Sequence, residues 1–402
     1  MARCLTLLVL AALWLPATAP AAGPAATRAV VERQVLAAGG ASGGFAVDLD
    51  SGRELSSVRA DSPRVPASVE KLYTTSTALL RLGPSARIET SVMAEQPLLP
   101  DGIVEGDLYL RGGGDPTLDR EGLETLAADL VAGGLLRITG RVVGDESAFD
   151  ARRGPPSSFF RTSAYVGPLG ALTYNRGLTG LRAPYFQVSP ARFAADAFAR
   201  ILRAEGVRVP RTGRMGTAPE FAASLATWQS PRVAELARRT NAPSDNFMAE
   251  TLLKLLGVSD GRPGTTAAGA AVVRSTMARL GIRPRVVDGS GLSRSNQTTP
   301  RQVVKLLRTM ADDDVFPAFR SSLAIAGRTG TLHDRMRGSV ARGRCRAKTG
   351  TLISVSALAG YCETRGGSLV AFAFLMNAVN PYGARQLQDR ALDALARYSP
   401  GS

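Results

Sequence analysis

Three short motifs carry residues that could together activate a serine for attack on a carbonyl carbon. In chain order they are Ser68-Val69-Glu70-Lys71, Ser244-Asp245-Asn246 and Lys348-Thr349-Gly350. A serine with an adjacent base is an activated nucleophile, and lysine is one of the groups that can serve as that base. The pattern therefore predicts acyl-transfer chemistry with Ser68 as the nucleophile and Lys71 as its base.

Lysine is scarce in this chain. Of 49 basic residues only four are lysines, namely Lys71, Lys254, Lys305 and Lys348. A desolvated lysine loses its proton and acts as a base, whereas arginine stays charged. Two of the four lie in the motifs, which favours a chemical use for them. We expect no chemistry from Lys254 and Lys305, and we expect arginine to be tolerated at both positions.

The first two motifs predict how the serine is activated. Ser68 and Lys71 lie three residues apart on an expected helix and so share a face. Lys71 must be neutral to take the serine proton, and both burial and a second cation such as Lys348 lower a lysine pKa. Ser244 is a candidate proton shuttle, and Asn246 is a candidate to hold Lys71 and the substrate amide.

The third motif predicts how a substrate is held. Lys348 and Thr349 are expected to bind a free carboxylate, and Gly350 to let a substrate backbone approach closely. The backbone N–H of Thr351, with that of Ser68, would form an oxyanion hole. Each motif alone is weak, since Ser-x-x-Lys also occurs on solvated helix faces and Ser-Asp-Asn also reads as a helix N-cap. Their combination and order favour the catalytic interpretation.

The elements that must position these motifs follow from hydrophobic periodicity. Strands are expected at 44–50, 53–58, 88–93, 106–110 and 136–143, and three consecutive strands at 344–348, 354–362 and 369–376. Helices are expected at 68–82, 191–205, 231–239, 247–256, 265–280, 302–310 and 386–398. The predicted class is α+β.

The long separation between Ser68 and Ser244 indicates a domain inserted after the first catalytic helix. The stretch from 89 to 188 is rich in expected strands and is the obvious insert. The predicted organisation is a signal peptide over 1–22, a catalytic domain over 23–88 and 189–402, and the inserted domain over 89–188.

The first 22 residues are typical of a secretory signal, with Arg3, an apolar run over 4–16 and small residues over 17–22. We therefore expect a periplasmic, extracellular or wall-associated protein without a transmembrane anchor. Cys345 and Cys362 then remain in the mature chain, on adjacent expected strands. A cross-strand disulfide and a pair of buried thiols are both open.

The composition favours a globular protein that has no nucleic-acid partner, metal or cofactor. Hydrophobic residues make up 45% and charged residues 21% of the chain, which is typical of a globular protein. The net charge of +15 would suit an acidic polymer or membrane surface, but the absence of long like-charge blocks favours a solvated arginine-rich surface. We expect no nucleic-acid partner. His333 is the sole histidine, so we expect neither a metal nor a cofactor.

These motifs resemble the D-alanyl-D-alanine carboxypeptidase/endopeptidase family, the low-molecular-mass class C penicillin-binding proteins of serine peptidase family S13. The resemblance spans the mature chain. It is carried by segments 66–75, 107–118, 288–294, 330–332 and 346–352 and by Asn241 with 244–250. It implies a penicillin-binding-protein/β-lactamase-like domain, with an antiparallel sheet flanked by helices, interrupted by the insert.

The resemblance also implies a reaction. Ser68 would attack the carbonyl between two D-alanines of a peptidoglycan stem peptide, form an acyl-enzyme and release D-alanine. β-Lactams would acylate the same serine, and some members also cut cross-links. Asp150, Arg294 and Leu352 are pocket candidates. The oligomeric state stays open.

Two rival functions remain. A serine β-lactamase would need a placed carboxylate to activate the deacylating water, and no Glu-x-x-Leu-Asn segment lies between the first two motifs. A non-catalytic wall-binding protein would not need Ser68, Lys71 and Lys348 intact.

Overall fold

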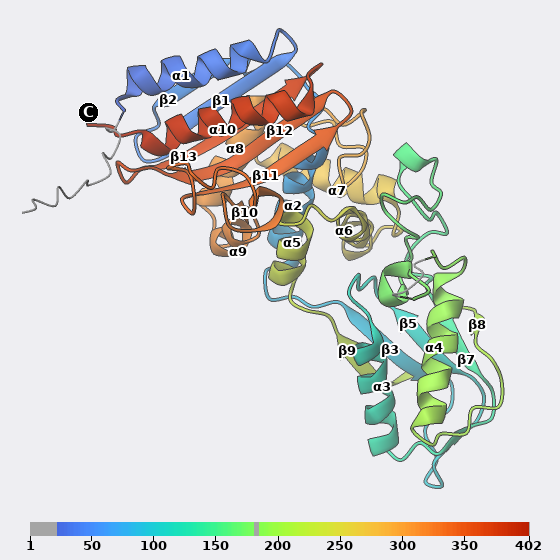
Figure 1. Cartoon of the computed structure of the whole chain (residues 1–402). Helices are drawn as coiled ribbons and strands as arrows, with labels where there is room; N and C mark the ends of the chain where they lie inside the picture. The colour runs from blue at the N-terminus through green and yellow to red at the C-terminus, as the bar shows by residue number, and fades with distance from the viewer. Residues whose placement is uncertain (1–21, 181–184, 402) are drawn as a thin grey trace, which may run out of the picture.

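A computed structural model of the chain describes residues 22–180 and 185–401 (Figure 1). The expected signal segment, except for Ala22, lies outside the described residues. Two β-sheets stand at opposite ends of the molecule, and a group of helices lies between them (Figure 1). No helix within the described ranges has the length and apolar character needed to cross a membrane.

The larger sheet has six strands in the order β10-β11-β12-β13-β1-β2, and every neighbouring pair is antiparallel. Within the sheet, β1 from the N-terminal part of the sequence pairs with β13 from the C-terminal part, and Phe45 lies opposite Ala373. The strands are β1 (Ser42–Asp48), β2 (Glu54–Val58), β10 (Ala324–Ile325), β11 (Cys345–Leu352), β12 (Val355–Glu363) and β13 (Leu369–Asn377).

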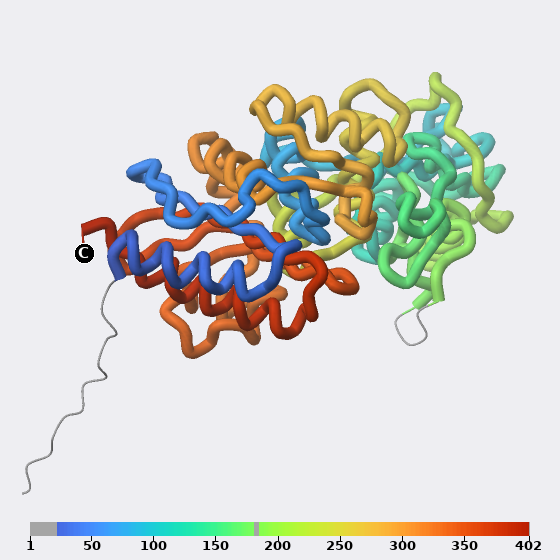
Figure 2. The backbone as a smooth tube through the Cα atoms, turned by 90° about the horizontal axis from the view of Figure 1, so that it is seen from above, coloured from blue at the N-terminus to red at the C-terminus, as the bar shows by residue number. Residues whose placement is uncertain are grey.

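Helices cover both faces of this sheet. Strands β12 and β13 are apolar and buried along almost their whole length, so both faces need cover. Helices α1 (Pro24–Ala37) and α10 (Pro381–Arg397) lie side by side on one face (Figure 2). Helix α8 (Pro300–Ala311) packs on the other face, in a core shared with the central helices.

The central helices surround the first motif. A short 3₁₀ turn, η1 (Ala67–Glu70), leads into α2 (Lys71–Leu82), which is buried from Lys71 to Leu79. Because α2 is buried on all sides, it can hold side chains away from water. The helices near it are α5 (Val233–Asn241), α6 (Asn246–Ser259), α7 (Thr266–Arg279) and α9 (Phe316–Ser321).

The smaller sheet has five strands in the order β8-β7-β5-β3-β9. Helices α3 (Arg120–Ala132) and α4 (Pro190–Ala204) share its apolar core. The strands are β3 (Glu89–Ala94), β5 (Leu108–Gly112), β7 (Val142–Asp145), β8 (Arg214–Met215) and β9 (Ala223–Gln229). Two short parallel strands, β4 (Ile103–Val104) and β6 (Arg137–Ile138), form a separate sheet. In the chain both fall between β3 and β7.

This sheet alters one expected limit. Strand β9 pairs with β3, and α4 packs on β7 and β8, so the expected boundary at residue 188 falls inside the structure built around this sheet. The strand expected over 136–143 is also split into β6 and β7. A Cβ at Gly140, between them, would lie 2.3 Å from the carbonyl oxygen of Gly106, so the chain turns there at close quarters.

The expected class is confirmed: an α+β fold with an antiparallel sheet flanked by helices and a second strand-rich unit that follows helix α2. The open question about the cysteines is also answered. Cys345 and Cys362 lie opposite each other on β11 and β12 and form a disulfide.

Candidate active site

Ser68 lies on a tight turn rather than at the start of a regular helix. Ala67, directly before it, has a left-handed φ of 47°. Such conformations cost energy in residues other than glycine and cluster at functional sites. Two glycines make room for the turn: a Cβ at Gly350 would lie 2.6 Å from the Pro66 carbonyl oxygen, and one at Gly291 would lie 1.9 Å from that of Ala67.

Gly350, which was expected to admit a substrate backbone, also has a close neighbour inside the protein. Its missing side chain faces the turn that carries Ser68, where a Cβ would also lie 3.0 Å from the Ser68 nitrogen. Glycine at this position lets strand β11 come close to Ser68.

Lys71 is fully buried, and its Nζ contacts three oxygens. It lies 2.6 Å from the Ser290 carbonyl, 2.7 Å from Asn246 Oδ1 and 3.0 Å from Ser68 Oγ. A neutral amine has two N–H groups and one lone pair. The two carbonyl oxygens can only accept, so they take the two N–H groups and leave the lone pair facing the Ser68 hydroxyl. This geometry suits a base.

The charges around Lys71 differ from the expectation. Burial lowers the pKa of Lys71 to about 8, against the carboxylates of Glu250 and Asp288, which raise it. We had expected the charge of Lys348 to lower the pKa of Lys71, but the influence of one lysine on the other is clearest in the opposite direction. Burial lowers the pKa of Lys348 well below its usual value, and the charge of Lys71 lowers it further. Burial, more than a second cation, makes Lys71 a usable base.

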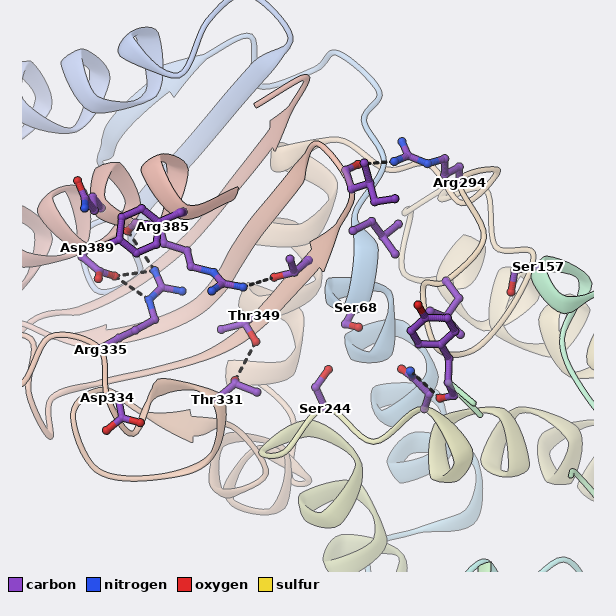
Figure 3. Close-up of a pocket in the computed structure, with 18 of the residues that line it drawn as sticks. Ser68, Ser157, Ser244, Arg294, Thr331, Asp334, Arg335, Thr349, Arg385 and Asp389 are labelled. Atoms are coloured by element: carbon purple, nitrogen blue, oxygen red, sulfur yellow. Dashed lines mark hydrogen bonds and ion pairs between the residues drawn. The ribbon is translucent and has the colours of Figure 1, made fainter. Parts of the chain in front are cut away.

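The second motif lies in the turn between α5 and α6. Ser244 has a left-handed φ of 65°, and Asp245 caps α6 by accepting a hydrogen bond from the Met248 nitrogen at 2.9 Å. That cap places Asn246 on the first turn of α6. Its Oδ1 accepts from Lys71, and its Nδ2 donates to the Tyr165 carbonyl at 3.0 Å. Ser68 and Ser244 both point into the same cavity (Figure 3).

The third motif lies on an open part of β11. The Cys345 carbonyl accepts from the Ala326 nitrogen at 3.0 Å, so Cys345 directs its backbone groups toward the β10 side. In an antiparallel strand the backbone N–H and C=O groups of alternate residues point to the same side, so those of Thr349 and Thr351 point to the same side as those of Cys345. Strand β10 ends at Ile325, opposite Arg346, and so does not reach these residues. The backbone groups of Thr349 and Thr351 therefore point from the free edge of the strand, beside the Ser68 turn.

Two hydroxyls and an ammonium group meet at this edge. Thr349 Oγ1 donates to Thr331 Oγ1 at 2.8 Å, and Lys348 Nζ donates to the Thr349 carbonyl at 2.8 Å. Lys348 is buried, so its amine lies just behind the cavity wall. An anion placed against Thr349 and Thr331 would gain hydrogen bonds and a nearby cation.

A cavity of about 1240 Å³ runs across this site. In Figure 3 Thr349, Thr331, Arg335 and Arg385 lie on one side of Ser68, and Arg294 and Ser157 lie on the other. The expected site residues at its wall are Ser68, Ser244, Asn246, Thr349 and Thr351, together with the pocket candidates Arg294 and Leu352. Lys71, Lys348 and Gly350 lie directly behind them.

Asp150 is not at this wall. Its Oδ1 accepts from Lys254 Nζ at 2.6 Å, and Lys254 is fully buried on α6. Arginine was expected to be tolerated at Lys254, but its ammonium group fills a closed site that also includes the Arg152 carbonyl at 2.8 Å, so we now expect the larger guanidinium group to be costly there.

Three groups in the site had no role assigned from the sequence. They are the carbonyls of Ser290 and Tyr165 and the hydroxyl of Thr331. Backbone carbonyls leave no signature in residue type. The tight-turn segment 288–294 was the available signal for Ser290.

Within residues 22–180 and 185–401, no group of three or more His, Cys, Asp or Glu side chains is arranged to hold a metal ion. His333 is exposed and pairs with Asp334 at the surface.

Comparison with known proteins identifies the family. The model of the D-Ala-D-Ala carboxypeptidase 3 (S13) family matches residues 29–185 and 185–398. The chain belongs to this family.

Curated relatives of this S13 protein match along most of their length. A D-alanyl-D-alanine carboxypeptidase of Actinomadura sp. (strain R39) is 30% identical over 96% of this chain and 87% of its own. Carboxypeptidase DacB of Mycolicibacterium smegmatis is 32% identical over 88% of this chain and 79% of its own. Among solved structures, penicillin binding protein 4 from Haemophilus influenzae superposes with a TM-score of 0.80 at 22% identity, covering 92% of this chain and 99% of its own, which supports the fold.

Proposed function

We propose that this S13 protein is a serine D-Ala-D-Ala carboxypeptidase that acts on peptidoglycan stem peptides through an acyl-enzyme on Ser68. The observation that carries the proposal is the contact of Lys71 Nζ with Ser68 Oγ at 3.0 Å, with two carbonyl oxygens fixing the direction of the lone pair. The Thr349 and Thr331 hydroxyls beside it give the terminal carboxylate of such a peptide a place to bind.

Acylation begins with the terminal carboxylate against Thr349, Thr331 and Lys348. Lys71 takes the hydroxyl proton as Ser68 Oγ bonds to the penultimate carbonyl carbon. The oxyanion that forms accepts hydrogen bonds from the N–H groups of Ser68 and Thr351. As the intermediate collapses, the C–N bond breaks and the leaving D-alanine amine receives a proton, passed from Lys71 through the Ser244 hydroxyl.

Deacylation repeats these steps with water. Water gives a proton to Lys71 as its oxygen bonds to the ester carbon, and the proton returns to Ser68 Oγ when the ester bond breaks. The stem peptide leaves with a new carboxylate. Asn246 keeps Lys71 in place throughout.

The proposal extends to inhibitors and location. β-Lactams acylate Ser68, and the structure of penicillin binding protein 4 from Haemophilus influenzae in complex with a β-lactam supports this part of the proposal. Cross-linked peptides are a second substrate. Residues 1–22 act as a secretory signal and direct the protein to the periplasm or cell wall. The Cys345–Cys362 disulfide supports export, because disulfides persist in oxidising compartments. The inserted domain is proposed to span about 89–230, following the pairing of β3 with β9.

Labelled penicillin followed by a D-Ala-D-Ala peptide tests the function. We expect stable label on Ser68, D-alanine release by the wild type, and neither in Ser68→Ala. Rapid loss of label without D-alanine release would favour the β-lactamase rival. Absence of both label and release, with retained binding to wall polymer, would favour the non-catalytic rival.

A further inference from the structure

One turn of backbone supplies a carbonyl to the lysine base. Ser290 lies in segment 288–293, and its carbonyl oxygen is the nearest of the three oxygens around Lys71 Nζ, at 2.6 Å. A carbonyl in a turn stays in place only if the turn is fixed. What holds this turn therefore also holds the amine whose lone pair must face Ser68.

Two buried carboxyl groups fix the turn. Glu250 Oε1 accepts from the backbone nitrogens of Gly289 at 3.1 Å and Ser290 at 2.8 Å. Asp288 accepts from the nitrogens of Gly291 at 2.9 Å and Ser293 at 2.7 Å. All of these groups are buried, where such hydrogen bonds are strong and costly to lose.

Glu250 also has a direct relation to the second motif. It follows Asn246 by four residues on α6, so both side chains project from one face of the helix. Asn246 reaches Lys71 through its own amide, and Glu250 reaches it through the Ser290 peptide. One helix face thus acts on both carbonyl oxygens that orient the amine, and Asp288 assists at the second by accepting from the Gly291 nitrogen of the peptide unit that carries the Ser290 carbonyl.

We propose that Glu250 is a positioning residue for Lys71, which holds the Ser290 carbonyl on Nζ and adjusts, by its own charge, how readily Lys71 gives up a proton. The inference rests on the proposed function and names a residue that the three motifs do not contain.

The electrostatic part has a structural basis. Oε2 of Glu250 and both carboxyl oxygens of Glu70 have no hydrogen-bond partner among the described residues. Burial raises the pKa of Glu250 to about 8, the same value to which burial lowers that of Lys71. The charged groups facing Lys71 are Glu70 beside it, Glu250 and Asp245 from α6, Asp288 from the turn, and Lys348 from β11.

Two substitutions separate position from charge. Glu250→Gln keeps an oxygen for the Gly289 and Ser290 nitrogens, places an amide where Oε2 has no partner, and removes the charge. Glu250→Ala removes the oxygen. The measurement is the second-order rate of Ser68 acylation by labelled penicillin from pH 5 to 10, with the melting temperature recorded for each variant. Glu235→Gln, which removes a carboxylate bound to Arg238 and Arg239 at the surface of α5, is the matched control.

We expect Glu250→Ala to acylate about 10²-fold more slowly on the high-pH plateau, the cost that a misplacement of about 1 Å can carry, and to show the same change in pH dependence as Glu250→Gln, because it loses the same charge. Glu250→Gln should acylate at the wild-type rate at high pH, where the rate levels off. The acid limb, meaning the fall in rate toward low pH, should move to lower pH than in the wild type, because the lost negative charge no longer favours protonated Lys71. Glu235→Gln should match the wild type.

Wild-type acylation in Glu250→Ala, or an unmoved acid limb in Glu250→Gln, would overturn this inference while leaving the proposed function intact. If the alanine variant does not fold, the acid limb of the glutamine variant decides alone. A wild type that penicillin does not label at all would overturn the proposed function and this inference together.

Discussion

Two of the four lysines are buried on neighbouring helices and have different partners. Lys71 Nζ contacts a hydroxyl and two carbonyl oxygens, whereas Lys254 Nζ contacts the Asp150 carboxylate. A carboxylate partner favours the charged form, and uncharged oxygens favour it much less. Lys71 is therefore suited to exchange a proton. Burial lowers the pKa of Lys254 as well, but the Asp150 carboxylate opposes that shift and favours the ammonium form.

Lys71→Arg should abolish acylation although it keeps the positive charge. A guanidinium group does not release its proton in proteins, so the serine loses its base. General-base catalysis contributes about 10²–10⁴-fold, and we expect at least that loss in penicillin labelling. A variant labelled at the wild-type rate would rule out Lys71 as the base.

The pH dependence of acylation should follow Lys71. The reactive form is the neutral amine, and the pKa of Lys71 is about 8. The acylation rate should therefore rise with pH and level off above about 8, whereas protonation at lower pH should remove activity. Stopped-flow measurements of the wild-type acylation rate at a series of pH values test this rise. A rate that does not change from pH 6 to 9 would contradict the assignment of Lys71 as the base.

At the scale of elements, strand β11 and turn η1 form the site by close approach. The strand carries the third motif past the serine turn, and Gly350 is the point of contact. The same strand is tied to β12 by the Cys345–Cys362 disulfide, three residues before Lys348. The Gly350 contact on one side of β11 and the disulfide to β12 on the other thus fix the distance between β11 and η1.

Gly350→Ala should push β11 away from the serine turn. The new Cβ would lie 2.6 Å from the Pro66 carbonyl oxygen, and neither backbone can yield without moving Ser68 or Thr351. We expect a loss of about 10²-fold in acylation, since a shift of about 1 Å is enough for that. Gly383→Ala, which meets nothing within 4 Å, is the control and should retain the wild-type rate.

Replacing both Cys345 and Cys362 with alanine should lower stability without removing the active-site groups. The disulfide closes a loop with a sequence separation of 17, and a loop of about 15 residues is associated with about 3 kcal/mol. Thermal unfolding with and without reductant measures the effect. Reductant should lower the melting temperature of the wild type and leave that of the double variant unchanged.

At the scale of the whole molecule, side chains of the central helix α6 connect the two sheet-bearing parts. Lys254 binds Asp150, and Asn246 donates to the Tyr165 carbonyl, both in the segment after β7. Arg176 also pairs with Asp245 at 2.6 Å. The loop that lines one side of the cavity is thus held by the helix that orients Lys71.

Lys254→Arg should destabilise the protein, because a larger guanidinium group must enter a closed site made for an ammonium ion. Overpacking of this kind costs about 1–3 kcal/mol. Lys305→Arg is the matched control, since Lys305 is exposed and binds only the Gly281 carbonyl, and it should change stability by less than about 0.5 kcal/mol. Denaturant melts of both variants test the contrast, and equal stabilities would contradict it.

Sequence patterns predicted which side chains lie together at the cavity better than they predicted the elements that support them. The three motifs, the three C-terminal strands and most helices were predicted because each has a residue-type signature. Helices α1, α3 and α9 had not been predicted. Helix α1 buries only Thr27, Val31 and Val35, a stripe too thin to give a clear period.

Strand β9, which extends the smaller sheet beyond residue 188, was not predicted for a different reason. Strand β9 alternates weakly and is largely exposed, so only its pairing with β3 assigns it to the smaller sheet. Glu250 was likewise hidden, since its role depends on the position of the Ser290 turn, which lies 40 residues away in the chain. Long-range pairing of this kind carries no local signal.

The strand order of the larger sheet has a consequence for how the protein is made. Strand β1 is synthesised well before its neighbour β13, because most of the other elements lie between them in the chain. The sheet cannot close until nearly the entire chain is available, and contacts between such distant segments form slowly. Strand β11, which carries the third motif, belongs to the same sheet, so we expect the serine site to form only after β13 has been made.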